Sequence, residues 1–216
     1  MLKLIKKEFV LALHPVTPIM LLLSAMVLIP NYPYVVIFFY VSMAIFFTCL
    51  SGRENNDVVY SLNLPIKKSN IVKARFICAS IIQMLQLLLM IPLCVLSQTW
   101  NKSGNQAGMD PGISLFAVGF IVYGIFNLVF FLHYYRNVNK VGIAFLLSSI
   151  VIFVCTALDV ISTHAIPFVK NFIDTPGVEN LSHKLVFLCI GILMYILITF
   201  FTYKICVTNF EKQDLN

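Results

Sequence analysis

Charged side chains are scarce in this chain. Asp, Glu, Lys and Arg make up 11% of the 216 residues, whereas about a quarter is usual in a soluble globular domain. Apolar residues make up 60%. Because a membrane-spanning helix needs roughly 20 apolar residues, the length allows about six spans and no separate catalytic domain. We therefore expect one all-α integral membrane domain over residues 1–216.

Catalytic and metal-binding signatures are also missing. The sequence contains no phosphate-binding P-loop, no HExxH or GxSxG pattern, and no pair of carboxylates within an apolar run. We therefore expect no ATP hydrolysis by the chain itself, no catalytic residue and no bound metal or cofactor. No CxxC pair occurs, so the cysteines are predicted to be small buried apolar residues. They are Cys49, Cys78, Cys94, Cys155, Cys189 and Cys206.

Long apolar runs take the place of these signatures. They predict six spans, at about residues 16–29, 34–50, 76–97, 113–133, 141–161 and 185–207. Residues 1–14 are too short and too charged to span, and they predict an amphipathic helix in the membrane interface with its lysines at the headgroups. Pro15 and Pro18 favour a break after His14. In the alternative interpretation, residues 1–14 simply begin the first span.

The basic residues are distributed unevenly between the predicted loops. If the N-terminus is inside, twelve Lys and Arg residues lie in inner segments, and only Lys102, Lys170 and Lys184 lie in outer ones. The positive-inside rule then places both termini in the cytoplasm. The net charge of +6 therefore indicates membrane topology, and we expect no nucleic-acid partner.

Residues 53–76 form the longest polar segment on the predicted inner side. Val58, Val59 and Leu62 have helical spacing and are predicted to form one apolar stripe, which Pro65 ends. Ser69 can cap the helix that follows. The segment therefore predicts a short amphipathic helix at the inner membrane face, between the second and third spans. The alternative is an ordinary basic loop that obeys the topology rule.

Polar residues within the predicted spans allow two interpretations. Polar groups in lipid need partners, so their side chains should point at other helices or at a cavity. They either form hydrogen bonds between helices or line a substrate path. The residues are Gln83, Gln86, Asn127 and Asp159.

The polar segment also resembles a known family. Glu54, together with residues 60–76 (YSLNLPIKKSNIVKARF), resembles the loop after the second span in small permeases of the type 2 ATP-binding-cassette exporters. Their pattern is an acidic residue, Leu-Ser-Leu-Pro-(Val/Ile), a basic pair, and (Ile/Val)-Val near a basic residue. Asn63 stands where Ser is usual. The motif covers about two dozen residues, and the topology is similar over nearly the whole chain.

The resemblance implies a bacterial plasma-membrane permease that works with a separate cytoplasmic ATPase, which binds ATP and Mg. Two permeases, identical or different, would assemble with two ATPases. The loop after the second span would be the coupling helix that enters a groove on the ATPase. Small members often export peptides, including bacteriocins and amphipathic cytolytic peptides, or confer resistance to them. The coupling residues implied are Glu54, Asp57, Val58, Tyr60, Leu62, Leu64 and Pro65.

Two other functions stay open on the sequence alone. A membrane substrate-binding subunit of a vitamin importer has a similar length and about six spans, but it would favour a conspicuous small-molecule pocket. An intramembrane enzyme or a scaffold is the third alternative, and the enzyme would need clustered catalytic residues at depth. A neighbouring ATPase gene would favour the exporter.

The predicted topology can be tested by cysteine-accessibility labelling in intact cells. Because of the basic asymmetry, cysteines at Asn105 and Asn171 should react with an impermeant reagent from outside. Cysteines at Asn56 and Asn216 should react only after the membrane is opened. External labelling at position 56 would contradict the predicted orientation.

Overall fold

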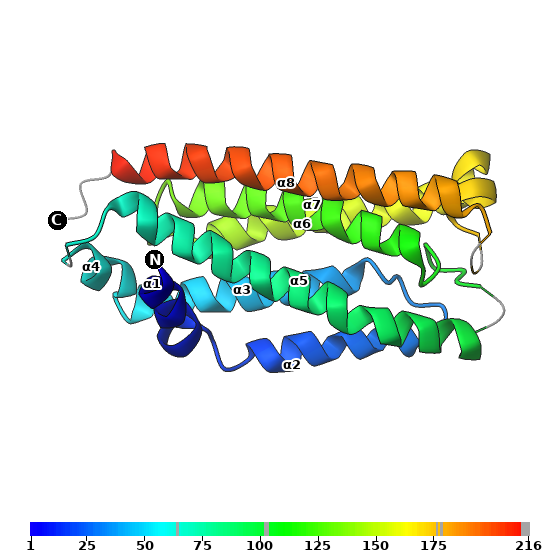
Figure 1. Ribbon diagram of the computed structural model, residues 1–216, viewed down its shortest axis with the longest axis horizontal. Helices are drawn as coiled ribbons and strands as arrows, with labels where there is room; N and C mark the ends of the chain where they lie inside the picture. The colour runs from blue at the N-terminus through cyan, green and yellow to red at the C-terminus, as the bar shows by residue number, and fades with distance from the viewer. Residues whose placement is uncertain (64, 102–103, 176, 178, 213–216) are drawn as a thin grey trace.

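The chain folds into a bundle of helices that run along one common direction (Figure 1). The computed structural model describes residues 1–212 apart from 64, 102, 103, 176 and 178. Within this part of the chain the regular elements are all helical. They are α1 (Leu2–Lys7), η1 (Glu8–Ala12), α2 (Thr17–Leu22), η2 (Leu23–Leu28), α3 (Val36–Glu54), α4 (Asp57–Leu62), α5 (Lys68–Trp100), α6 (Ile113–Tyr134), α7 (Val141–Ala165), η3 (Val169–Ile173) and α8 (Leu181–Glu211).

Five helices in the described chain are long and apolar enough to cross a membrane: α3, α5, α6, α7 and α8. The predicted all-α membrane protein is therefore confirmed. The helix α5 has 33 residues and α8 has 31. At about 1.5 Å per residue each is 45–50 Å long, which exceeds the roughly 30 Å hydrocarbon core. Both helices must therefore tilt or extend beyond the lipid.

The predicted first span is the exception. Leu2–Ala12 and Thr17–Leu28 qualify as a span only together, and the two pieces meet at an angle of 89°. The break falls where Pro15 follows His14. The N–H of His14 donates to Thr48 Oγ1 of α3, and the N–H of Val16 donates to His14 Nδ1. The structure therefore contains five candidate spans, or six if this bent pair counts as one.

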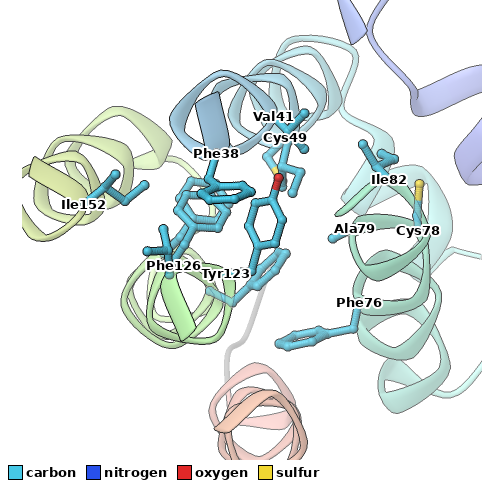
Figure 2. Packing of buried hydrophobic residues seen from close by; sticks show 14 of the residues in the cluster. Phe38, Val41, Cys49, Phe76, Cys78, Ala79, Ile82, Tyr123, Phe126 and Ile152 are labelled. Atoms are coloured by element: carbon cyan, nitrogen blue, oxygen red, sulfur yellow. The ribbon is translucent and has the colours of Figure 1, made fainter. Parts of the chain in front are cut away.

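The helix α6 lies at the centre of the packing and contacts α3, α7 and α8. Figure 2 shows Phe38 of α3 lying against Tyr123 and Phe126 of α6. The Phe38 and Tyr123 rings meet edge to face with centroids 5.4 Å apart, a favourable arrangement of two aromatic quadrupoles. Most of the largest fully buried side chains are aromatic.

Small residues set the distance between α6 and α8. A Cβ atom at Gly191 of α8 would lie 2.7 Å from the carbonyl oxygen of Ala117 in α6. Backbones approach this closely only where a side chain is absent, which is a common way for helices to associate in lipid. By contrast, a Cβ atom added at Gly142, near the start of α7, would meet no neighbouring atom within 4 Å.

These two glycines provide a matched test of the α6–α8 contact. Gly191→Ala should lower the thermal unfolding temperature in detergent, because overpacking against a backbone atom costs about 1–3 kcal/mol. Gly142→Ala should leave it unchanged or raise it, since Ala favours a helix by up to ~1 kcal/mol over Gly. Equal unfolding temperatures for the two variants would show that the close approach is not needed.

Candidate functional site: the α4 end of the bundle

The short helix α4 lies at the end of the bundle that also carries both chain termini (Figure 1). We call this the α4 end, and the opposite end, with residues 104–112 and 166–175, the loop end. Asn56 adopts a left-handed conformation (φ 52°, ψ 31°) between α3 and α4. Asn tolerates this region better than most residues. The turn directs α4 away from the axis of α3.

The helix α4 has an inner and an outer face. Val58 and Ser61 are buried, whereas Val59 is 46% and Tyr60 is 63% exposed. Residues four apart, such as Val58 and Leu62, share a helix face. Val58 and Leu62 therefore pack toward the bundle, and Val59 turns outward with Tyr60. The prediction of one stripe containing Val58, Val59 and Leu62 is wrong for Val59.

Four charged side chains meet beneath the inner face of α4. Arg75 Nη2 donates to Asp57 Oδ2 over 2.8 Å, and Arg75 Nε lies 2.8 Å from Glu8 Oε2. Lys7 Nζ pairs with Asp57 and donates to Ser61 Oγ over 2.7 Å. Glu8 is 2% and Arg75 is 4% exposed. We call Lys7, Glu8, Asp57 and Arg75 the ionic cluster.

The ionic cluster holds α4 to three other elements. Lys7 belongs to α1, Glu8 to η1 and Arg75 to α5. A Cβ at Gly52 would lie 3.4 Å from Arg75 Nη2, so the guanidinium also packs against the backbone of α3. Two cations face two carboxylates, and separating them would leave buried charge uncompensated, at a cost of about 3–5 kcal/mol. The position of α4 is therefore fixed from its inner side.

The residues predicted for coupling do not form a single surface. Glu54 ends α3 with an exposed side chain 3.8 Å from Arg53. Tyr60 and Pro65 are exposed, so with Glu54 they lie on the outside. Asp57, Val58 and Leu62 lie on the inner side, and Leu64 falls outside the described residues.

Sequence reasoning missed the ionic cluster. Lys7 was expected at the lipid headgroups, but its ammonium group is bonded to α4. The available signal was Glu8, the one acid in a basic N-terminal segment. An isolated carboxylate that must leave water needs a cation, although the sequence does not say which one.

Two of the predicted substrate-path residues form a reciprocal amide pair. Gln83 Nε2 donates to Asn127 Oδ1 over 2.9 Å, and Asn127 Nδ2 donates back to Gln83 Oε1 over 3.1 Å. From α8, Tyr195 OH donates to Gln83 Oε1, and Thr199 Oγ1 accepts from Asn127. The pair therefore connects α5, α6 and α8 deep in the bundle.

The other two predicted path residues lie elsewhere. Gln86 Nε2 donates to the carbonyl of Ile37 in α3 over 3.0 Å. Asp159 Oδ2 accepts the N–H of Met109 at the loop end over 3.2 Å. Gln83, Gln86, Asn127 and Asp159 are all buried, so in this conformation they do not line one open path. Gln83, Gln86 and Asn127 form hydrogen bonds between helices, whereas Asp159 bonds α7 to the loop that contains Met109.

Partly buried side chains form hydrogen bonds across the loop end. Asp174 Oδ1 accepts the N–H of Asp110 over 2.7 Å, and Lys184 Nζ donates to the carbonyl of Thr175. Burial raises the pKa of Asp174 from 3.8 to about 6, although the bond from Asp110 opposes the shift. A carboxyl whose pKa is raised by folding favours the folded form while protonated. Its contribution to stability therefore falls as pH rises from about 4 through about 6.

A double-mutant cycle tests the ionic cluster. Arg75→Met and Glu8→Met should each lower the free energy of unfolding by about 3–5 kcal/mol, because each leaves the opposite charge buried. The double variant should lose less than the sum, since neither charge remains. Arg53→Met removes an exposed pair with Glu54 and should cost under about 1 kcal/mol. Additive losses at positions 8 and 75 would contradict the pairing.

The comparisons with known proteins gave one match. Residues 3–211 match a family model described as ABC-2 family transporter protein. No curated protein and no solved structure matches the chain. The matched segment includes α4, the ionic cluster and every candidate span. Within the described residues, no group of three His, Cys, Asp or Glu side chains could hold a metal ion.

Proposed function

The chain belongs to the ABC-2 family of transporter proteins, and on that premise we propose that it exports its substrate with energy from an ATPase that contacts α4. The family identifies the chain as a membrane permease subunit of an ABC transporter, with ATP hydrolysis in a partner subunit. It does not favour the vitamin-importer alternative. Outward transport, the cytoplasmic location of the α4 end and an amphipathic or antimicrobial peptide as substrate are parts of the proposal.

The two faces of α4 carry the proposal. The inner face is fixed by the ionic cluster to α1, η1 and α5, while the outer face presents an apolar and an aromatic side chain, Val59 and Tyr60. A partner that binds the outer face and displaces α4 would also displace Arg75, near the start of α5. The ion pairs resist separation because the charges are buried. Force applied at α4 would thus reach a membrane-spanning helix.

The exposed residues define the contact that we propose. A few buried aromatic side chains usually dominate the binding energy of an interface, and Tyr60 is the exposed aromatic residue of α4. Glu54 and Pro65 are also accessible, so they remain in the proposed contact. Asp57, Val58 and Leu62 instead position α4. The ATPase groove should therefore offer an apolar pocket with a cation near Glu54.

We further propose an assembly of two permeases and two ATPases, with the transport path near the interface of the permeases. Gln83, Gln86, Asn127 and Asp159 can line that path only if the helices rearrange, because their side chains are buried in this conformation. Parting α5 from α6 would expose Gln83 and Asn127 together, since they bond only across this contact and to α8. Leucine at Gln83 and Gln86 should then reduce transport more than folding.

Tyr60→Ala tests the contact with the ATPase. Loss of a central aromatic anchor costs about 2 kcal/mol or more, so co-purification with the ATPase should weaken at least tenfold and stimulated ATP turnover should fall. Trp100→Ala removes a similarly exposed aromatic residue at the loop end and should change neither quantity. Lys67→Gln should also leave association nearly unchanged.

Membrane insertion of the Tyr60 variant should be normal, because its side chain is exposed and α4 is held from the other side. Normal association and turnover in this variant would refute α4 as the coupling contact. Direction can be measured in vesicles with the ATPase side facing out. An exporter should accumulate labelled peptide inside them upon addition of ATP, whereas loss of preloaded peptide would indicate import.

A further inference from the structure

The helices α5 and α8 enclose a hollow that is open along its side. Its volume is about 660 Å³, and its walls include Ile77, Ile81 and Leu85 of α5 and Ile196 and Phe200 of α8. A second hollow of about 680 Å³ shares Met84 and Leu88 and continues to Gln98 near the loop end. We call the first of these the α5–α8 groove. Both helices are candidate membrane spans, so the groove opens toward lipid.

The groove lies beside contacts in the interior of the bundle. The helix α8 approaches α6 closely at Gly191, and Gln83 of α5 pairs with Asn127 of α6. The helices α5 and α8 also pack directly on each other. Tyr195, whose hydroxyl donates to Gln83, forms part of the groove wall. Tyr195 and Gln83 thus connect the groove wall to the buried polar pair.

One cation, Lys73, lines the groove, and a second, Lys204, lies beside Phe200 of the α8 wall. Lys73 belongs to α5, and Lys204 Nζ lies 4.7 Å from the centroid of the Phe200 ring in the opposite wall. The spacing Lys73, Ile77, Ile81 and Leu85 repeats every four residues, which places them on one helix face. Both ammonium groups are exposed, and within the described chain neither forms an ion pair.

We propose that the α5–α8 groove binds an anionic phospholipid of the cytoplasmic leaflet, with its phosphate between Lys73 and Lys204 and an acyl chain along the apolar walls. The leaflet rests on the orientation in the proposed function. Lys73 to Leu88 rises about 22 Å along α5, more than half of the roughly 30 Å hydrocarbon core. The apolar wall of the groove is therefore long enough to contact the whole acyl chain of a lipid in one leaflet.

The positive charges of Lys73 and Lys204 favour an anionic phospholipid over an apolar protein surface. An apolar helix face of a second permease would cover the walls but leave both cations without an anion. The acids at the α4 end that belong to the ionic cluster, Glu8 and Asp57, are already paired. A phosphate diester supplies the missing charge at the depth of the headgroups, where each basic residue attracts an anionic surface.

Photo-crosslinking in vesicles tests the proposal with the full-length protein. Phosphatidylglycerol with a diazirine in one acyl chain is added to phosphatidylcholine vesicles, and labelled peptides are identified by mass spectrometry. We expect labels on Ile81 or Leu85 and on Ile196 or Phe200, several-fold above those from a phosphatidylcholine probe with the same chain. Equal labelling by the two probes would overturn the proposal.

Charge variants test the role of the lysines. Each basic residue near an anionic surface contributes about a fivefold gain in affinity. Lys73→Gln with Lys204→Gln should therefore reduce phosphatidylglycerol labelling to the level of phosphatidylcholine. Arg136→Gln with Lys140→Gln removes the same charge from exposed positions between α6 and α7 and should leave labelling unchanged. An equal fall in both double variants would show non-specific surface attraction and overturn the proposal.

A variant that fills the groove tests the acyl-chain site. Ile81→Trp adds volume at a lipid-facing position without changing charge, so it should reduce labelling of α8 at least threefold. Rapid disulfide formation between two copies carrying Leu85→Cys, with loss of lipid labelling, would instead identify a second permease in the groove. These readouts use no ATPase. They can therefore fail while the Tyr60 test succeeds, or the reverse.

Discussion

The pairing of Arg75 with Glu8 and Asp57 is the constraint on which the α4 end depends. Arg75 sits near the start of a spanning helix and is 4% exposed, so its charge cannot be left without partners. Glu8 comes from the N-terminal segment and Asp57 from the first turn of α4. A short helix of six residues, which would be marginal by itself, thereby acquires a fixed position between segments far apart in sequence.

Deeper in the bundle the buried polar groups are uncharged, because a buried charge there would cost too much free energy. There the polar groups are neutral amides and hydroxyls that satisfy one another, as Gln83 and Asn127 do. Hydrogen bonds between helices in lipid are worth only about 0.6 kcal/mol on average, so they can be exchanged at little cost. The ionic cluster resists separation while the interior contacts are replaceable, a combination consistent with the proposed transmission of movement from α4 to the helices.

The sequence predicted the elements better than their contacts. Long apolar runs identified α3, α5, α6, α7 and α8, because length and hydropathy determine whether a helix can span. Helical spacing predicted α4 but placed Val59 on the wrong side. Three apolar residues in so short a helix do not determine which side of it faces the bundle. The pairing of Glu8 with Arg75 was out of reach, because it joins positions 67 apart and either charge could equally have faced water or headgroups.

The ionic cluster also bears on the bent first segment. Four ionised groups would be very costly at the bilayer centre, which favours the predicted interfacial position for Leu2–Ala12. If Leu2–Ala12 lies there, only Thr17–Leu28 is left to cross the membrane in this part of the chain. Six α-helical and six 3₁₀ residues rise about 21 Å, less than the roughly 30 Å core. A short span is accommodated by local thinning of the bilayer or by partner helices.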